Sequence, residues 1–145
     1  MKKKERQRVK RANKLLVSAI VLGTLATPAF AAEMTWNDLK SAVEGSDTEI
    51  TVPNDIIRQS TDSDITITRT LSIIGNTTDR YLSGATTYNG FNINADGDLT
   101  LTNISMKNFK SSSNGGAISN RGTISSITGD FINNSASASG STAYG

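Results

Sequence analysis

The stretch Asp64-Ile65-Thr66-Ile67-Thr68-Arg69-Thr70-Leu71-Ser72-Ile73-Ile74-Gly75 decides the fold. Its apolar residues alternate with Thr and Ser, which is the period of a strand with one buried face. Gly75 and Asn76 then supply a turn. The same short alternation returns along the chain and predicts further strands at 50–52, 91–94, 99–102, 104–106, 117–119 and 123–125. From residue 49 onward we therefore expect an all-β chain.

One short helix is expected before the strands, within residues 32–46. Thr35 and Asp38 form a capping-box pattern that places a carboxylate near the positive end of a helix. Gly45 is expected to end the helix. The apolar residues at spacings i, i+3 and i+7, which share one helix face, are Trp36, Leu39 and Val43.

The first 31 residues have the order of a secretory signal peptide. Eight Lys and Arg lie within Met1–Lys14, and an apolar run of 12 residues, Leu15–Ala26, follows. Ala29 and Ala31 are the small residues that signal peptidase accepts, and Pro28 precedes them. The alternative is an uncleaved membrane anchor, which needs about 20 apolar residues. We therefore predict cleavage after Ala31 and export from the cytoplasm.

The chain that remains after cleavage, residues 32–145, is acidic. It keeps seven of the 15 Lys and Arg and 12 of the 13 Asp and Glu, a net charge of −5. This balance argues against a nucleic-acid partner, because contacts to phosphates require many cations. The absence of Cys and His removes disulfides, the usual zinc ligands, and catalysis by a Cys nucleophile or a Ser-His-Asp triad. We expect no cofactor.

The second half of the chain carries a short repeat. Leu101–Ile104 matches Ile124–Ile127 at an offset of 23, and Phe109 matches Phe131 at an offset of 22. A period in the low twenties with three short strands per unit is typical of a solenoid. A β-sandwich predicts a similar pattern, because its strands recur about every 8–12 residues. The period alone therefore leaves both folds open.

Two motifs favour the solenoid: Gly115-Gly116-Ala117-Ile118 and Phe131-Ile132-Asn133-Asn134. GGAI followed by FxxN resembles the repeat of polymorphic outer-membrane proteins and related autotransporter passengers. The resemblance implies a right-handed parallel β-helix with a short N-terminal capping helix. We thus expect a signal peptide at 1–31, the capping helix at 32–46, and β-helix coils at 47–145. These coils are expected to be truncated before the outer-membrane barrel that such proteins carry at their C-terminus.

The same motifs predict local conformations. Gly115 and Gly116 can adopt positive φ at a corner between strands. Phe131 is expected to stack inward, and Asn134 is expected to turn the corner, because Asn tolerates the left-handed conformation. The earlier unit, Phe109–Ser112, keeps the Phe but has lost the final Asn.

The resemblance also implies a function. It favours a secreted or cell-surface β-helix passenger that acts in adhesion and structural presentation, with a host-cell or matrix ligand as its partner. Such a protein would reside at the cell surface, in the outer membrane or outside the cell, and in the periplasm if no barrel exists. It would contact the outer membrane only through the missing barrel.

The alternatives are a carbohydrate-active β-helix enzyme, either a lyase or a hydrolase, and a non-functional truncated remnant. Glycoside hydrolysis needs two carboxylates across the sugar. The pairs spaced to share one face of a strand are Asp62 with Asp64 and Asp96 with Asp98. The local cations that could act as the base of a lyase are Lys107, Lys110 and Arg121.

Turn formation explains these carboxylates equally well, because both pairs precede strands and Asp is a common turn residue. Asp96 and Asp98 alone also supply too few oxygen ligands for Ca²⁺, which binds about six to eight oxygens. We assign no catalytic, cofactor-binding or metal-binding residue and favour a non-enzymatic role.

Overall fold

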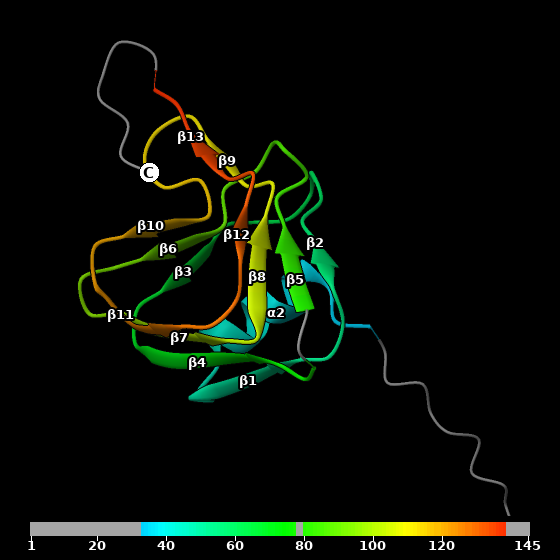
Figure 1. The fold of residues 1–145 in the computed structure, drawn as a ribbon. Coiled ribbons are helices and arrows are strands. Elements are labelled where there is room, and N and C mark those ends of the chain that lie inside the picture. Colours follow the sequence, from blue (N-terminus) through cyan, green and yellow to red (C-terminus); the bar gives the residue numbers. More distant parts are fainter. Residues whose placement is uncertain (1–32, 78–79, 139–145) are drawn as a thin grey trace, which may run out of the picture. The chain divides into compact units, whose positions relative to one another are not determined.

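The computed structural model describes residues 33–77 and 80–138, so the predicted signal peptide lies outside the described residues. Within these ranges the chain forms one α-helix followed by short strands (Figure 1). Every strand pairing in the described ranges is parallel. Short parallel strands from successive turns of the chain form a β-solenoid, which confirms the predicted parallel β-helix.

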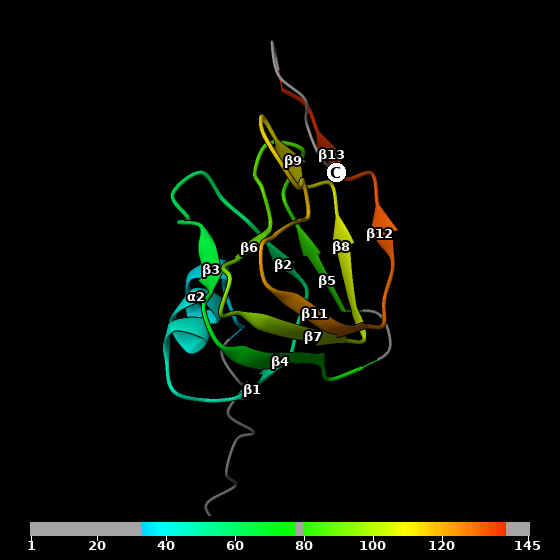
Figure 2. The same cartoon turned by 90° about the vertical axis from the view of Figure 1, so that its left-hand side faces the viewer.

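The helix α2 spans Trp36–Glu44 and forms the expected cap. The Thr35 side chain accepts a hydrogen bond from the Asp38 N–H, and the Asp38 carboxylate accepts one from the Thr35 N–H. Gly45 ends the helix in extended backbone (φ −71°, ψ −165°), with its N–H donating to carbonyls of the last turn. α2 packs at the end of the solenoid where the first strands lie (Figure 2).

The chain visits the same faces in the same order on each turn, and the strands on each face form one sheet. Sheet A contains β1 (Glu49–Val52), β4 (Thr70–Gly75), β7 (Asp98–Thr102) and β11 (Thr123–Ile127). Sheet B contains β2 (Ile56–Ile57), β5 (Arg80–Ser83), β8 (Ile104–Lys107) and β12 (Phe131–Ile132). Sheet C contains β3 (Ile65–Ile67), β6 (Phe91–Ile93) and β10 (Ile118–Asn120). The short sheet D contains β9 (Lys110–Ser111) and β13 (Ser135–Ala136).

The length of a coil varies more than the sequence repeat suggests. Glu49 pairs with Ser72, 23 residues later, whereas Thr70 pairs with Asp98, 28 residues later. The sequence match of Phe109 with Phe131 is not the structural repeat, because Phe131 pairs with Met106 at an offset of 25. Loops of different length absorb these differences, since only the strands must stay in register.

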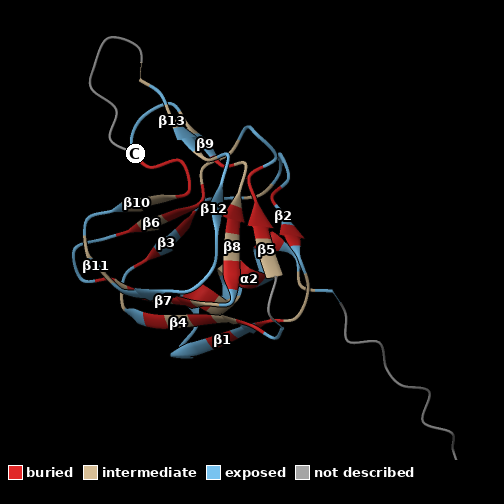
Figure 3. Ribbon diagram, in the orientation of Figure 1, coloured by how far each residue is buried: buried red, intermediate tan, exposed pale blue. Residues whose placement is uncertain are grey.

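Apolar side chains form ladders inside the solenoid. Alternate residues of each strand point inward, and paired residues of successive coils stack on one another. Figure 3 shows the inward positions of the middle coils as buried. The ladders that the pairings define are Ile50–Ile73–Leu101–Ile127, Leu71–Leu99–Ile124, Ile56–Leu82–Met106–Phe131 and Ile65–Phe91–Ile118.

Trp36 joins the cap to this core. Its indole is 1% exposed, and its ring centroid lies 6.0 Å from those of both Phe91 and Phe109. Its Nε1–H donates to the carbonyl of Ser63 at 2.9 Å, so the buried ring leaves no polar atom unpaired. The helix therefore closes the first coil by inserting an aromatic side chain rather than by only lying across it.

The last coil has an open inward face. Phe131 occupies the inward position that the register predicts, but it is 45% exposed, whereas its partner Met106 is fully buried. Ile127 is 36% exposed beside fully buried Leu101. Within the described residues no further coil stacks on this face, which explains why the same ladder positions differ in burial (Figure 3).

Asn133, and not Asn134, turns the corner after Phe131. Asn133 has φ 55°, matching φ 55° at Asn108 in the preceding coil. The Asn134 side chain instead bridges to that coil, accepting from the Phe109 N–H at 2.9 Å and donating to the Met106 carbonyl at 2.8 Å. The prediction for Asn134 was wrong because sequence distance alone does not say which of two adjacent Asn takes the left-handed conformation.

Candidate functional site

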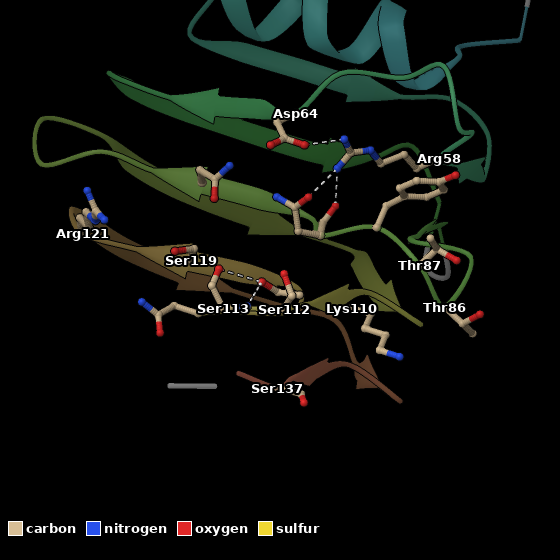
Figure 4. A pocket seen from close by; sticks show the side chains of 15 residues that line it. Arg58, Asp64, Thr86, Thr87, Lys110, Ser112, Ser113, Ser119, Arg121 and Ser137 are labelled. Carbon is tan, nitrogen blue, oxygen red and sulfur yellow. Dashed lines mark hydrogen bonds and ion pairs between the residues drawn. The ribbon is translucent and has the colours of Figure 1, made fainter. Parts of the chain in front are cut away.

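A polar groove of about 850 Å³ lies along the outward side of sheet C and the neighbouring loops (Figure 4). Its floor is the outward face of the sheet, where Asn92 of β6 pairs with Ser119 of β10. Since Phe91 and Ile93 point into the core, the pleat of β6 directs Asn92 outward. The alternation that builds the core thus also builds the floor of the groove.

Loops from three successive coils form the wall of the groove. Thr86, Thr87 and Tyr88 come from one coil, Ser111–Ser113 from the next, and Ser137 from the last. Backbone hydrogen bonds hold these loops in order: the Lys110 N–H donates to the Tyr88 carbonyl at 2.8 Å, and the Ser137 N–H donates to the Ser111 carbonyl at 2.9 Å. The wall is therefore part of the stacked solenoid rather than a set of independent loops.

Arg58 anchors the end of the groove next to the helix. The residue is 4% exposed, and its guanidinium lies 5.3 Å from the Trp36 ring and 5.4 Å from the Tyr88 ring. It donates to the Asn89 carbonyl at 2.7 Å and forms an ion pair with Asp64. These contacts tie the cap, the floor and the wall together, as expected for a buried cation that is paired and held between aromatic rings.

The Nε of Arg58 is the exception, since this buried atom has no hydrogen-bond partner within the described residues. The rest of the guanidinium is well satisfied, with further bonds to the Asn89 side chain and the Asp62 carbonyl. The arrangement favours a positioning role for Arg58 over direct access to a ligand.

The groove continues into a second hollow of about 280 Å³. Asn92, Ser119 and Arg121 line both hollows. Thr66 extends the second hollow, and it pairs with Asn92 across β3 and β6. The two hollows therefore run across the paired strands as one elongated depression.

The candidate carboxylates from the sequence do not form a catalytic pair. Asp64 lines the groove, but its carboxylate is paired with Arg58. The Asp62 side chain accepts from the Asn37 side chain at 2.9 Å and from the Gln59 N–H at 2.7 Å, which are the contacts of a turn residue. Asp64 thus balances the charge of Arg58, whereas Asp62 stabilises a turn.

Asp96 and Asp98 lie away from the groove. Asp98 begins β7 and accepts from the Ser125 hydroxyl at 2.7 Å, while Asp96 is exposed in the turn before that strand. Across the described ranges no group of three or more acidic, His or Cys side chains gathers to hold a metal ion.

The candidate cations separate in the folded chain. Lys110 and Arg121 line the groove, whereas Lys107 lies on sheet B with its ammonium 4.5 Å from the Tyr81 ring. Sequence reasoning missed Arg58, Tyr88 and Asn89, because nothing local marks a cation that becomes buried. Arg is usually solvated, so its burial is visible only in the tertiary structure.

No helix within the described residues has both the length and the apolar character needed to cross a bilayer. The fold and the groove together describe a parallel β-solenoid protein with a polar depression on one lateral face. In comparisons with known proteins, the chain matches no protein-family model, no curated protein and no solved structure.

Proposed function

We propose that this chain is an exported β-solenoid passenger segment that acts in adhesion, with the groove along sheet C as its contact surface. The observation that carries the proposal is the elongated polar groove whose floor and wall are set by the stacking of the coils. A rigid sheet that presents outward polar side chains can bind a ligand without ordering its own backbone on contact. The signal-peptide pattern at 1–31 supports a location outside the cytoplasm.

Adhesion can be tested with beads that carry the protein, produced from the full sequence and exported by its host. We expect the beads to bind cells or extracellular matrix and to lose this binding on Asn92→Ala with Ser119→Ala. Thr100→Ala is the matched control, because Thr100 lies on β7 of sheet A and does not line the groove. Equal binding by all three proteins would contradict a role for the groove.

Export can be tested independently by fractionating the cells and sequencing the N-terminus of the product. We expect the mature chain to begin at Ala32, in the periplasmic, surface or extracellular fraction. A cytoplasmic product that still carries Met1 would contradict the export part of the proposal and leave the groove open to other roles.

A carbohydrate-active enzyme is the second candidate, and the presence of Asp64 in the groove is the observation that favours it. A hydrolase would need a second carboxylate beside the bound sugar. The other residues that line the groove carry hydroxyl, amide, phenol or cationic groups. Release of new reducing ends from a polysaccharide, lost on Asp64→Asn, would favour the enzyme over the adhesin.

A further inference from the structure

We infer that the groove along sheet C binds an anionic polysaccharide, one that carries carboxylate or sulfate groups along an extended chain. The inference rests on the proposed function and names the ligand class of the same groove. Its starting point is the distribution of charge. Three of the seven Lys and Arg in residues 32–145 line the groove, against one of the 12 Asp and Glu.

Two of these three cations are available to a ligand. Arg58 is buried and paired with Asp64, so its charge is already balanced. Lys110 and Arg121 are exposed, and their side chains make no hydrogen bond or ion pair within the described residues. On an acidic chain, two unpaired cations in one depression create a local site for negative charge.

The two available cations lie apart along the groove. Figure 4 shows Arg121 toward one end and Lys110 toward the other, with Ser119 and Ser113 between them. Arg121 also lines the second hollow, so the depression extends past it. Spaced cations in an elongated groove suit a polymer with charges at intervals better than a compact ion, which needs its donors to converge.

Hydroxyl and amide groups cover the surface between these cations. Ser and Thr hydroxyls both donate and accept hydrogen bonds, and Asn amides do the same, which matches the mixed donor and acceptor pattern of sugar hydroxyls. Within the part of the chain that the structure describes, the side chains of Asn92 and Ser119 make no hydrogen bond, so both can turn to a ligand. A sugar chain would thus meet polar partners along its length.

Other polymers fit the groove less well. A peptide that adds a strand would pair at the edge of β10, which is free within the described residues, and not across the outward face where the groove runs, because β6 at the floor is paired on both sides, with β3 and β10. A nucleic acid needs many more cations than Lys110 and Arg121 to neutralise its phosphates. The observations therefore favour an anionic glycan.

The test uses three polymers of one backbone and one length: dextran, carboxymethyl dextran and dextran sulfate. Binding to the exported protein is measured by calorimetry or by biolayer interferometry. We expect binding to one or both charged polymers, little binding to dextran, and weaker binding as salt increases. Carboxymethyl dextran and dextran sulfate distinguish carboxylate from sulfate as the preferred group.

The decisive variant is Lys110→Gln with Arg121→Gln. Each cation is expected to make a hydrogen bond to a charged group of the polymer. The free energy of such a bond corresponds to about a tenfold fall in affinity for each cation removed. The matched control is Arg80→Gln with Lys107→Gln, which removes the same charge from two partly exposed positions on sheet B. We expect less than a threefold change, roughly the limit for such charges off the site. Unfolding midpoints of both double variants that equal the midpoint of the unsubstituted protein show that folding is intact.

Each outcome bears on one proposal. Equal losses of affinity in the two double variants would mean nonspecific attraction to the charged polymers. Equal binding to all three polymers would mean that charge is irrelevant. Either result overturns the proposal that the groove binds an anionic polysaccharide. If the beads still adhere through Asn92 and Ser119 in those cases, the proposed adhesive function stands. If the beads do not adhere while a charged dextran binds through Lys110 and Arg121, the glycan site stands and adhesion fails.

Discussion

Replacing Leu101 and Ile127 by Ala in separate variants tests how the coils stack. The two residues pair directly, Leu101 on β7 and Ile127 on β11, and both point into the solenoid. They are isomers, so the substitution removes the same number of carbon atoms at each position. Leu101 is fully buried, and Ile127 is 36% exposed. Any difference between the variants therefore reports on what covers each position.

The structure sets the expected magnitudes. At Leu101 the lost transfer free energy is about 2.4 kcal/mol, from about 0.8 kcal/mol for each of three carbon groups. A cavity closed by the coils on both sides raises the total to about 3–5 kcal/mol. At Ile127 about two-thirds of the transfer free energy is at stake, roughly 1.5 kcal/mol. The space left there opens to solvent, so no closed cavity adds to the loss.

Urea unfolding measures both values, with fluorescence of Trp36 as the probe. Trp36 is the single Trp of the sequence and is buried between the cap and the core. We expect Leu101→Ala to lower the free energy of unfolding by at least about 1 kcal/mol more than Ile127→Ala. Equal losses near 3 kcal/mol or so would refute the open last coil, because Ile127 would then be covered as completely as Leu101. A loss below about 1 kcal/mol at Leu101 would refute its inward register.

Three further predictions concern the cap, a corner and the open face. Hydrogen bonds from the side chain and then the backbone of Thr35 lower the pKa of Asp38 below 3.8. The stability that this lowered pKa adds is present above pH 3.8 and is lost as the pH falls through the pKa of Asp38 in the folded protein. Asp38→Asn should therefore make the urea midpoint fall less steeply with decreasing pH, and an unchanged pH dependence would contradict this prediction. Gly90→Ala places a Cβ 2.0 Å from the Ala117 carbonyl oxygen. It should cost about 3 kcal/mol or more by thermal unfolding, and a loss below about 1 kcal/mol would mean that the coil relaxes. Phe131→Ser should reduce concentration-dependent association in sedimentation, since Phe131 is 45% exposed on an apolar face; unchanged association would place the contact elsewhere.

Local chemistry in the sequence was sufficient to predict the helix and most of the longer strands. The capping box of Thr35 and Asp38 predicts where α2 begins, and alternation predicts the longer strands, such as β4 and β7. Strands of two residues, β2, β9, β12 and β13, escaped prediction because two residues cannot display a period. The four-residue strand β5 also escaped prediction, because its sequence does not alternate apolar and polar residues. The resemblance of the GGAI and FxxN motifs favoured the parallel β-helix, and the pairings confirm that fold.

The register and the groove required the tertiary structure. Asn134 bonds the backbone of Phe109, 25 residues earlier, and Phe131 pairs with Met106 rather than with Phe109. Arg58 reaches Asn89 and lies against Trp36 and Tyr88. Alternation and capping act within a few residues, so the amino-acid sequence alone indicates which side chains face inward and where the helix starts. Loop length and close packing between coils decide which distant residues meet, and only the folded chain brings Arg58, Lys110 and Arg121 to one groove.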